Sequence, residues 1–280
     1  IVLEKGGDVA MAREAVGAIG SRHSVGHEID HAKLMNHAKK VQSGDVNMAL
    51  YKTWMDKSGE FMDWLEDLEA PKGMSFPFEF HAPEGEDCYY PPMCTNPVMG
   101  EYMPEGPQLG AYTHLKVMRD LFLEAGGKIE FNTPAQQLVQ DSSGAVTGVI
   151  AKDNNNKYKQ YNAAKGVIVC TGGYGANKEM LQDLCPDAYN YCTSTAATTE
   201  EGDGIRMALW AGAHLEEGGG AMVWNRGVVT DNEEVGPELG NPLYLPASQP
   251  FLRVNVRGER IMNEDSTYPE IYAMGTRQPK

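Results

Sequence analysis

Residues 164–180, AKGVIVCTGGYGANKEM, combine a strand pattern, a glycine turn and a helix start in one short span. Residues 167–170 are apolar and mostly β-branched, which predicts a strand buried on both faces of a sheet. Gly172 and Gly173 end this run, and glycine lets the backbone approach a neighbour closely. Asn177 can cap the helix that follows. A strand leading into a glycine-rich turn predicts a ligand site in an α/β sheet, although such turns also serve as plain connections.

The start of the chain carries a second cofactor pattern. Residues 1–3 are an apolar strand that runs into Glu4 and Lys5. In a dinucleotide-binding βαβ unit the second strand ends in an acidic residue that binds the ribose, roughly 20 residues after a GxGxxG loop. Glu4 has this position, so the glycine loop is expected upstream of residue 1. An edge strand that ends in a solvated Glu-Lys pair would also fit.

The composition excludes several classes of protein. A net charge of -15 over 280 residues, without clustered Lys and Arg, excludes a nucleic-acid-binding protein. No apolar run approaches the ~20 residues of a membrane span. The five cysteines are odd in number and form no CxxC pair, which predicts free thiols, with Cys170 packed in its strand.

Helical and strand periodicities alternate along the chain, and three consecutive short strands are expected to form a β-meander between two halves of a parallel sheet. Gly202 and Gly204 free the backbone at a helix N-terminus, which suits an anion. The expected helices cover residues 31–41, 47–68, 112–125 and 205–213, and one begins after Asn177. The expected strands cover residues 128–131, 137–140, 146–152, 158–162 and 251–255.

One motif points to a different chemistry. His27, Glu28 and His31 match HExxH, and His37 has the spacing of a third zinc ligand. A zinc metalloprotease needs both histidines of the motif on one continuous helix, so that the imidazoles converge on the metal. Asp30 is a good N-cap for a helix that starts at His31, which would leave His27 outside that helix. The alternatives are a zinc site and solvated surface histidines.

Six segments together resemble the FAD-binding flavoproteins of the fumarate reductase and succinate dehydrogenase family, especially its soluble bacterial reductase branch. The resemblance implies an α/β fold: a Rossmann-like FAD-binding domain with an inserted β-meander at residues 1–225, then the start of an α+β capping domain at residues 226–280. It also implies a chain truncated at both ends, without the GxGxxG loop and the closing part. The segments are VLEKGG (2–7), the small-residue loop 8–24, NTPAQQLVQD with SGAVTGV (132–149), VIVCTGGYGANKEM (167–180), EEGDGIRMALWAGAH (200–214) and VNVRGERIMNED (254–265).

The resemblance also assigns cofactor contacts to individual residues. It implies that Glu4 binds the adenosine ribose with Lys5 beside it, and that Gly17 and Ala18 border the pyrophosphate and flavin. Ala135 is expected to meet adenine through its backbone. The remaining expected contacts are Thr171, Gly172 and Gly173, which pass close to the cofactor, and Asp203, which approaches the ribityl or flavin region.

The capping segment departs from the fumarate reductase pattern at the proton donor. The frame Asn-x-x-Gly-x-Arg fits from Asn255, but the position of the arginine that protonates the alkene holds Tyr268, and Tyr244 occupies the acidic position of the relay. A C4-dicarboxylate needs cationic partners, so the sequence does not favour fumarate as substrate. A tyrosine can donate a proton, and Tyr268 is the candidate acid. Plain packing of Tyr268 and donation by Arg277 are the alternatives.

These patterns predict an FAD-dependent oxidoreductase that reduces an activated C=C bond by hydride transfer from flavin N5. The expected partners are a small electron-poor alkene and an electron-donor domain or protein of unknown identity, with no nucleic acid and no membrane span. A ketosteroid-type dehydrogenase, acting in the reverse direction, is the alternative within the same chemistry. The zinc protease and a non-catalytic interaction module are the alternatives outside it.

Overall fold

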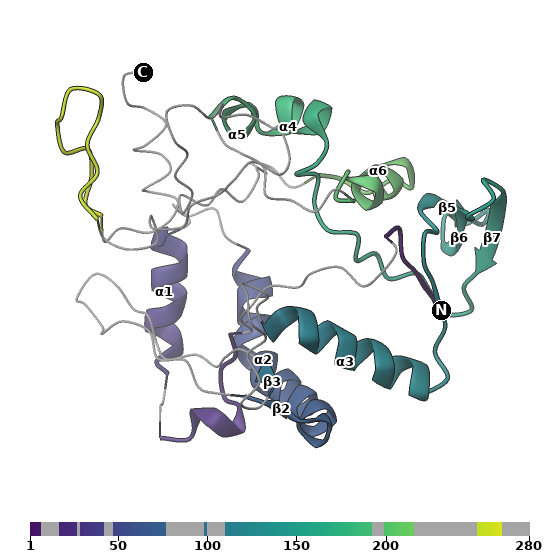
Figure 1. Cartoon of the computed structure of the whole chain (residues 1–280), viewed down its shortest axis with the longest axis horizontal. Coiled ribbons are helices and arrows are strands. Elements are labelled where there is room, and N and C mark those ends of the chain that lie inside the picture. The colour runs from purple at the N-terminus through teal and green to yellow at the C-terminus, as the bar shows by residue number, and fades with distance from the viewer. Residues whose placement is uncertain are drawn as a thin grey trace. The chain divides into compact units, whose positions relative to one another are not determined.

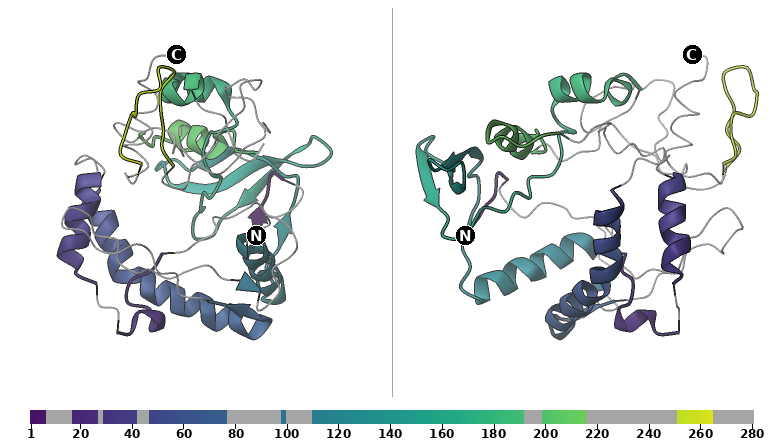
Figure 2. Two further views of the ribbon diagram at one scale, coloured as in Figure 1. Left: turned by 60° about the vertical axis from the view of Figure 1, so that its left-hand side comes forward. Right: turned by 180° about the vertical axis from the view of Figure 1, so that it is seen from behind.

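The computed structural model describes residues 1–6, 17–26, 29–41, 47–76, 98–99, 110–191, 199–215 and 251–264. The chain divides into two compact units (Figures 1 and 2). Unit 1 consists of residues 1–2 and 7–130, and unit 2 of residues 3–6 and 131–280. Each contains both helices and strands, so the described residues form a mixed α and β structure.

Unit 1 is built on helices that the sequence periodicity predicted. The long helix α2 begins after Asn47, whose side chain accepts hydrogen bonds from the backbone N–H groups of Ala49 and Leu50, as a good N-cap does. The predicted helices at 31–41, 47–68 and 112–125 are confirmed. The helices are α1 (His31–Val41), α2 (Met48–Glu69) and α3 (Gly110–Glu124), with 3-10 turns η1 (Arg22–Ser24) and η2 (Ala70–Lys72), and β2 (Met74–Ser75) pairs antiparallel with β3 (Val98–Met99).

The core of unit 1 lies along α2. Met62 and Leu65 are fully buried and pack with Ala18 of the segment that precedes η1. A second cluster joins Met55 of α2 to Ile19. Since apolar side chains on two successive turns of α2 bury the segment around residues 17–21, this helix and that segment form one packed element.

Unit 2 contains the predicted meander. Strands β5 (Ala135–Gln140), β6 (Val146–Lys152) and β7 (Tyr158–Asn162) form an antiparallel sheet in the order β5-β6-β7. Leu138 lies opposite Val149. The β5–β6 turn is fixed by Asp141, whose Oδ1 accepts from the backbone N of Ser143 at 2.8 Å, and by Gly144 at φ +86°, a conformation that favours glycine. The prediction of three short antiparallel strands is confirmed.

Three short helices complete unit 2: α4 (Lys178–Leu184), α5 (Pro186–Tyr191) and α6 (Asp203–Trp210). Asn177 caps α4 as predicted, with Oδ1 accepting from Met180 N at 3.0 Å. Helix α6 begins two residues earlier than expected and lies beside β5, where Gln140 Nε2 donates to Ala211 O at 3.1 Å. The helices predicted after Asn177 and at residues 205–213 are therefore confirmed, as α4 and α6.

Two predicted strands are absent. Residues 167–170 have no regular secondary structure, Ile168 is 90% exposed, and Cys170 is an exposed free thiol instead of a packed one. The reason is that no other strand among the described residues pairs with them, and a strand forms only with a hydrogen-bonded neighbour. Residues 251–255 make only the isolated bridge between Val254 and Arg260. At the other end of the chain, the strands expected at residues 1–3 and 128–131 are present as β1 (Val2–Leu3) and β4 (Ile129–Glu130), and they pair with each other.

None of the helices in the described part of the chain is long and apolar enough to cross a membrane.

Candidate functional site

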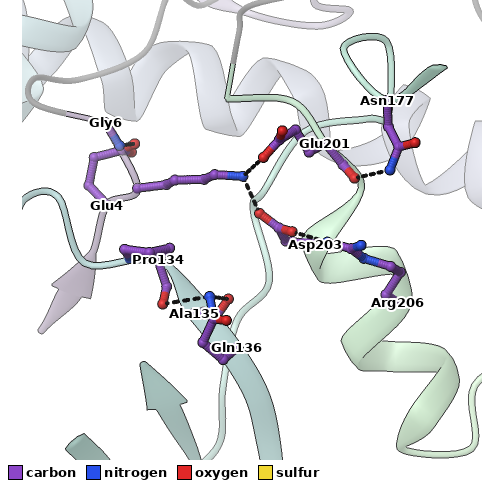
Figure 3. A network of polar contacts seen from close by, with 10 residues as sticks. Glu4, Gly6, Pro134, Ala135, Gln136, Asn177, Glu201, Asp203 and Arg206 are labelled. Atoms are coloured by element: carbon purple, nitrogen blue, oxygen red, sulfur yellow. Dashed lines mark hydrogen bonds and ion pairs between the residues drawn. The ribbon is translucent and has the colours of Figure 1, made fainter. Parts of the chain in front are cut away.

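The turn that follows β1 lies against the start of β5 in unit 2. Glu4 O accepts from Thr133 N at 2.9 Å, and Gly6 O accepts from Asn132 N at 2.8 Å. The Glu4 carboxylate closes the turn, with Oε1 accepting from Gly6 N at 2.8 Å. Its second oxygen has no hydrogen-bond partner among the described residues, so a hydroxyl group could bind there (Figure 3).

The start of β5, which lies next to Glu4, is irregularly paired with β6. The pairing of β5 with β6 shifts register between Ala135 and Gln137, a bulge of the kind that redirects a strand near a functional site. Gln136 Nε2 donates to the carbonyl groups of Ala135 at 3.2 Å and Pro134 at 3.3 Å. Figure 3 shows these residues next to Glu4. Two of the predicted cofactor residues, Glu4 and Ala135, are therefore neighbours.

Lys5 joins the same turn to the N-terminus of α6. Its Nζ contacts Asp203 Oδ2 at 2.5 Å and also pairs with Glu201, while Arg206 pairs with the other oxygen of Asp203. Lys5 is 28% exposed and Asp203 18%, so this pair is well shielded from water, whereas Glu201 is half exposed. Both carboxylate oxygens of Asp203 are thus engaged by cations (Figure 3).

The electrostatics of this group favour the charged forms. Burial opposes the charge on Lys5, but hydrogen bonds to Asp203 and Glu201 outweigh it and raise the pKa of the ammonium above its ordinary value. Burial likewise opposes the charge on Asp203, but hydrogen bonds from Lys5 and Arg206 lower the pKa of the carboxyl group. The bridge is therefore fully ionised around neutral pH.

The glycine turn at residues 171–173 packs directly on α6. Gly173 O accepts from Gly202 N at 3.0 Å. A Cβ on Gly204 would lie 2.0 Å from Thr171 Oγ1, so only glycine permits this contact. Gly172 has φ +68° and lies beside Glu200. The three predicted residues Thr171, Gly172 and Gly173 therefore form one packed corner with the first turn of α6.

No side chain of the described residues caps the first turn of α6. Gly202, at φ +76°, precedes the helix, and no side chain bonds to its first N–H groups from the described residues. The position of the turn is fixed from outside the helix, because Asn177 Nδ2 donates to Glu201 O at 3.0 Å. Uncapped N–H groups at a helix N-terminus can bind an anion, although Asp203 places a carboxylate in the same turn.

The predicted residues Gly17 and Ala18 lie in unit 1. Trp54 Nε1 donates to Gly17 O at 3.2 Å, and Ala18 is fully buried against Met62 and Leu65. Ala18 as a whole residue therefore belongs to the core of unit 1.

The turn that follows residue 251 is held by one carboxylate. Glu264 Oε1 accepts from Arg253 N at 3.1 Å, and Arg260 Nε lies 3.1 Å from Glu264 Oε2. The hydrogen bonds from Arg260 and from the Arg253 backbone lower the pKa of Glu264 to about 2. Tyr244 and Tyr268, the proton-donor candidates, lie outside the described residues, so their roles stay predictions.

The zinc-protease geometry is not met. Helix α1 begins at His31, and Asp30 caps it by accepting from Lys33 N at 3.0 Å. Residues 29 and 30 are not helical, so no single helix carries both histidines of the motif and that alternative is wrong. His27 and Glu28 lie outside the described residues, and within the described ranges no three His, Cys, Asp or Glu side chains gather as a metal site.

The sequence interpretation missed several residues that hold these turns. Glu201 and Arg206 complete the Lys5 bridge, and Ser58 and Gly59 of α2 contact the segment around Gly17 and Ala18. Of these residues, only Gly59 could have been identified from the sequence, because a glycine inside a helical pattern often marks a close backbone contact. Glu201 and Ser58 have partners far away in the sequence, and Arg206 pairs with Asp203 three residues before it.

Comparison with known proteins places the chain in a family. Residues 1–271 match the family described as FAD binding domain. Vinyl phenol reductase of Lactiplantibacillus plantarum is 30% identical over 149 residues, 53% of this chain and 30% of the relative. The 3-oxosteroid 1-dehydrogenase of Comamonas testosteroni is 49% identical over 81 residues, 29% of this chain and 14% of the relative.

A solved structure agrees in fold. The open conformation of a flavocytochrome c3 fumarate reductase superposes with a TM-score of 0.69 at 19% identity, covering 100% of this chain and 46% of that one. The chain thus spans less than half the length of each of these three proteins. Since the family match extends over nearly all 280 residues, the chain belongs to the FAD binding domain family, and FAD is its cofactor.

Proposed function

We propose that this chain is the FAD-binding part of an oxidoreductase that reduces an electron-poor C=C bond. The observation that carries the proposal is the meeting, within unit 2, of the Glu4 turn, the start of β5, the 171–173 turn and the first turn of α6. Segments far apart in the sequence meet there, and they contribute a carboxylate oxygen of Glu4, the bulge of β5, a glycine turn and the first N–H groups of α6.

The residues of this group fit the adenosine end of FAD. Glu4 keeps one carboxylate oxygen without a partner among the described residues, which suits a ribose hydroxyl, and Ala135 lies next to it at a backbone bulge that suits adenine. When bound, FAD supplies the hydride chemistry. In our proposal Gly17 and Ala18 border the pyrophosphate and flavin, as the family resemblance implies, and residues 171–173 pass close to the cofactor.

We assign Asp203 a structural role, whereas the family resemblance implies that it contacts the cofactor. Because Lys5 and Arg206 engage both of its oxygens, its main task in our proposal is to fix α6, with Lys5 as its counter-ion. A contact between Asp203 and the ribityl chain stays a prediction.

The finer architecture is also a proposal. We infer a Rossmann-like domain over residues 1–225 with the β5-β6-β7 meander inserted, followed by the start of an α+β capping domain at residues 226–280. The fold-level similarity to the fumarate reductase structure supports this division. The boundary itself falls outside the described residues.

The proposed substrate is an activated alkene that is not a simple dicarboxylate. The sequence offers Tyr268 and Tyr244 where a fumarate reductase has cationic and acidic groups, and two carboxylates would lack partners there. The similarity to a protein named vinyl phenol reductase supports a neutral alkene. The similarity to a 3-oxosteroid 1-dehydrogenase supports the alternative, a dehydrogenase that acts in the reverse direction. The electron donor is a separate domain or protein.

The experiment is anaerobic reoxidation of the dithionite-reduced full-length protein, followed by the return of flavin absorbance. A hydroxystyrene or an enone is expected to reoxidise the flavin, and fumarate is not. Tyr268→Phe should slow the reoxidation by about 100-fold or more, the usual contribution of a general acid, with FAD still bound. Tyr158→Phe, at an exposed strand residue, is the matched control and should leave the rate unchanged. Rapid reoxidation by fumarate, or an unchanged rate in Tyr268→Phe, would refute the proposal.

A further inference from the structure

The segment formed by residues 17–22, which we call the 17–22 loop, lies along one face of α2 and contacts it at successive turns. Trp54 Nε1 donates to Gly17 O at 3.2 Å. One turn later Ser58 Oγ accepts from Ile19 N at 2.9 Å. Further along, Asp63 Oδ1 accepts from Arg22 N at 2.9 Å. The order of contacts along the loop follows the order along the helix.

The lengths of the two elements agree with this side-by-side arrangement. Five residue steps from Gly17 to Arg22 can span at most about 18 Å, which is enough to follow nine helical residues from Trp54 to Asp63, about 14 Å. Main-chain groups of the loop are therefore satisfied by side chains at regular intervals on α2, which replace the regular hydrogen bonds that a strand or helix would provide.

Between these hydrogen bonds the helix backbone touches the loop backbone at Gly59. A Cβ built on Gly59 would lie 2.4 Å from Ile19 O and 2.4 Å from the carbonyl carbon of Gly20. Atoms this close cannot be accommodated unless backbone moves, because both neighbours are main chain. Gly20 itself has φ +73°, so the loop bends at the point of contact.

Charged residues fix the far end of the loop. Arg22 bonds through Nη1 to Asp67 at 2.8 Å and through Nη2 to Asp63 O at 3.2 Å. His23 Nε2 lies 2.8 Å from Glu66 Oε2. Ala18, at the opposite end, is fully buried. Side chains of α2 thus contact the 17–22 loop and His23 beside it at both ends.

We propose that α2 is a template that sets the conformation of the 17–22 loop for FAD, with Trp54, Ser58 and Gly59 as positioning residues. The proposal rests on the proposed function, in which Gly17 and Ala18 border the cofactor. None of the three positioning residues needs to touch FAD. They fix the loop before FAD arrives, so that binding does not have to order it, and a preorganised site binds more tightly for this reason.

The test measures FAD affinity and the properties of bound flavin in the full-length protein. Gly59→Ala should weaken FAD binding by about 10-fold or more, although alanine favours a helix over glycine. Ser58→Ala removes one acceptor and should weaken binding by about 3-fold to 10-fold. At saturating FAD, both should shift the visible absorption bands and the midpoint potential of the flavin, which a loss of global stability alone would not do.

Thr53→Ala is the matched control, because Thr53 is exposed and its hydroxyl donates within α2 to Ala49 O at 2.9 Å. It should leave FAD affinity and the flavin spectrum unchanged. If circular dichroism shows that Gly59→Ala does not fold, the test rests on the comparison of FAD affinity and flavin spectrum between Ser58→Ala and Thr53→Ala. Wild-type affinity and spectrum in Ser58→Ala would overturn the template while leaving the FAD-binding function intact. Failure of the wild-type protein to bind FAD would overturn the proposed function as well.

Discussion

Replacing Lys5 with methionine tests the bridge between the Glu4 turn and α6. Methionine keeps the apolar stem of the side chain and removes its charge. Asp203 then retains Arg206 but loses Lys5, its partner at 2.5 Å, and a carboxylate without full compensation remains beside the proposed anionic cofactor. We expect weaker FAD binding and a lower melting temperature.

The exposure of the two groups sets the size of the effect. Exposed ion pairs contribute about 0.2 to 1 kcal/mol, and breaking a buried pair costs about 3 to 5 kcal/mol. Lys5 is 28% exposed and Asp203 18%, which places this pair between the two limits, at about 2 kcal/mol. If half or more of that energy is needed for cofactor binding, FAD affinity falls by roughly 10-fold. The ion pair of Lys5 with Glu201 contributes little to this free energy, because the Glu201 side chain is half exposed.

The assay is a fluorescence titration of FAD into the apoprotein for a double-mutant cycle of Lys5→Met and Asp203→Asn. Removing both charges should restore part of the affinity lost in Lys5→Met, with a coupling energy of about 1 kcal/mol. Lys5→Arg should keep most of the affinity. Lys57→Met, at a pair with Glu60 in which both side chains are well exposed, is the control without effect. Additive effects of the two substitutions, or FAD affinity within about 2-fold of wild type in Lys5→Met, would refute the reasoning.

Four further outcomes follow from the same contacts. The melting-temperature difference between wild type and Lys5→Met should be constant from about pH 5 to 9 and shrink in acid. The pKa of Asp203 is lower in the folded protein than its ordinary 3.8, so the stability that ionised Asp203 contributes is complete above pH 3.8 and is lost as the pH falls through the pKa of the folded state. Conversely, the raised pKa of Lys5 makes its contribution present below 10.5 and lost as the pH rises through the folded value. A difference that grows in acid would contradict the sign for Asp203, and a difference that grows above pH 10.5 would contradict the sign for Lys5. Glu4→Gln should weaken FAD binding by about 10-fold in calorimetry, since a charge-assisted hydrogen bond becomes a neutral one. Leu65→Ala should lower the free energy of unfolding by about 2 to 5 kcal/mol in a denaturant titration, because Leu65 is fully buried. Asn177→Ala should cost about 1 kcal/mol through the lost cap on α4, and no change in either titration would contradict the packing described.

Local patterns predicted the helices and the meander because their causes are local. Apolar spacing along 47–68 produced α2, and the caps Asn47 and Asn177 lie where their side chains can reach the next turn. Asp141 and Gly144 close the turn between β5 and β6 from within five residues. Each of these features depends on interactions between near neighbours in the chain.

Features with distant partners could not be predicted in the same way. Lys5 and Asp203 are 198 residues apart in sequence, and Gly59 meets a loop some forty residues away, as the Ser58 bond to Ile19 over 39 residues shows. Residues 167–170 are apolar and mostly β-branched, which predicts a strand, but a strand also needs a paired neighbour, which the described residues do not provide. Glu4 and Ala135 could be proposed as cofactor residues from family resemblance, whereas their adjacency emerged only from the folded backbone.

The most direct test of the central claim is the visible absorption spectrum of the purified full-length protein, with the released cofactor identified by chromatography. We predict a flavin spectrum, FAD as the released molecule, and a clear loss of bound FAD in Glu4→Gln at equal protein concentration. A protein that contains no flavin and cannot be reconstituted with FAD would contradict the assignment of these turns as a cofactor site.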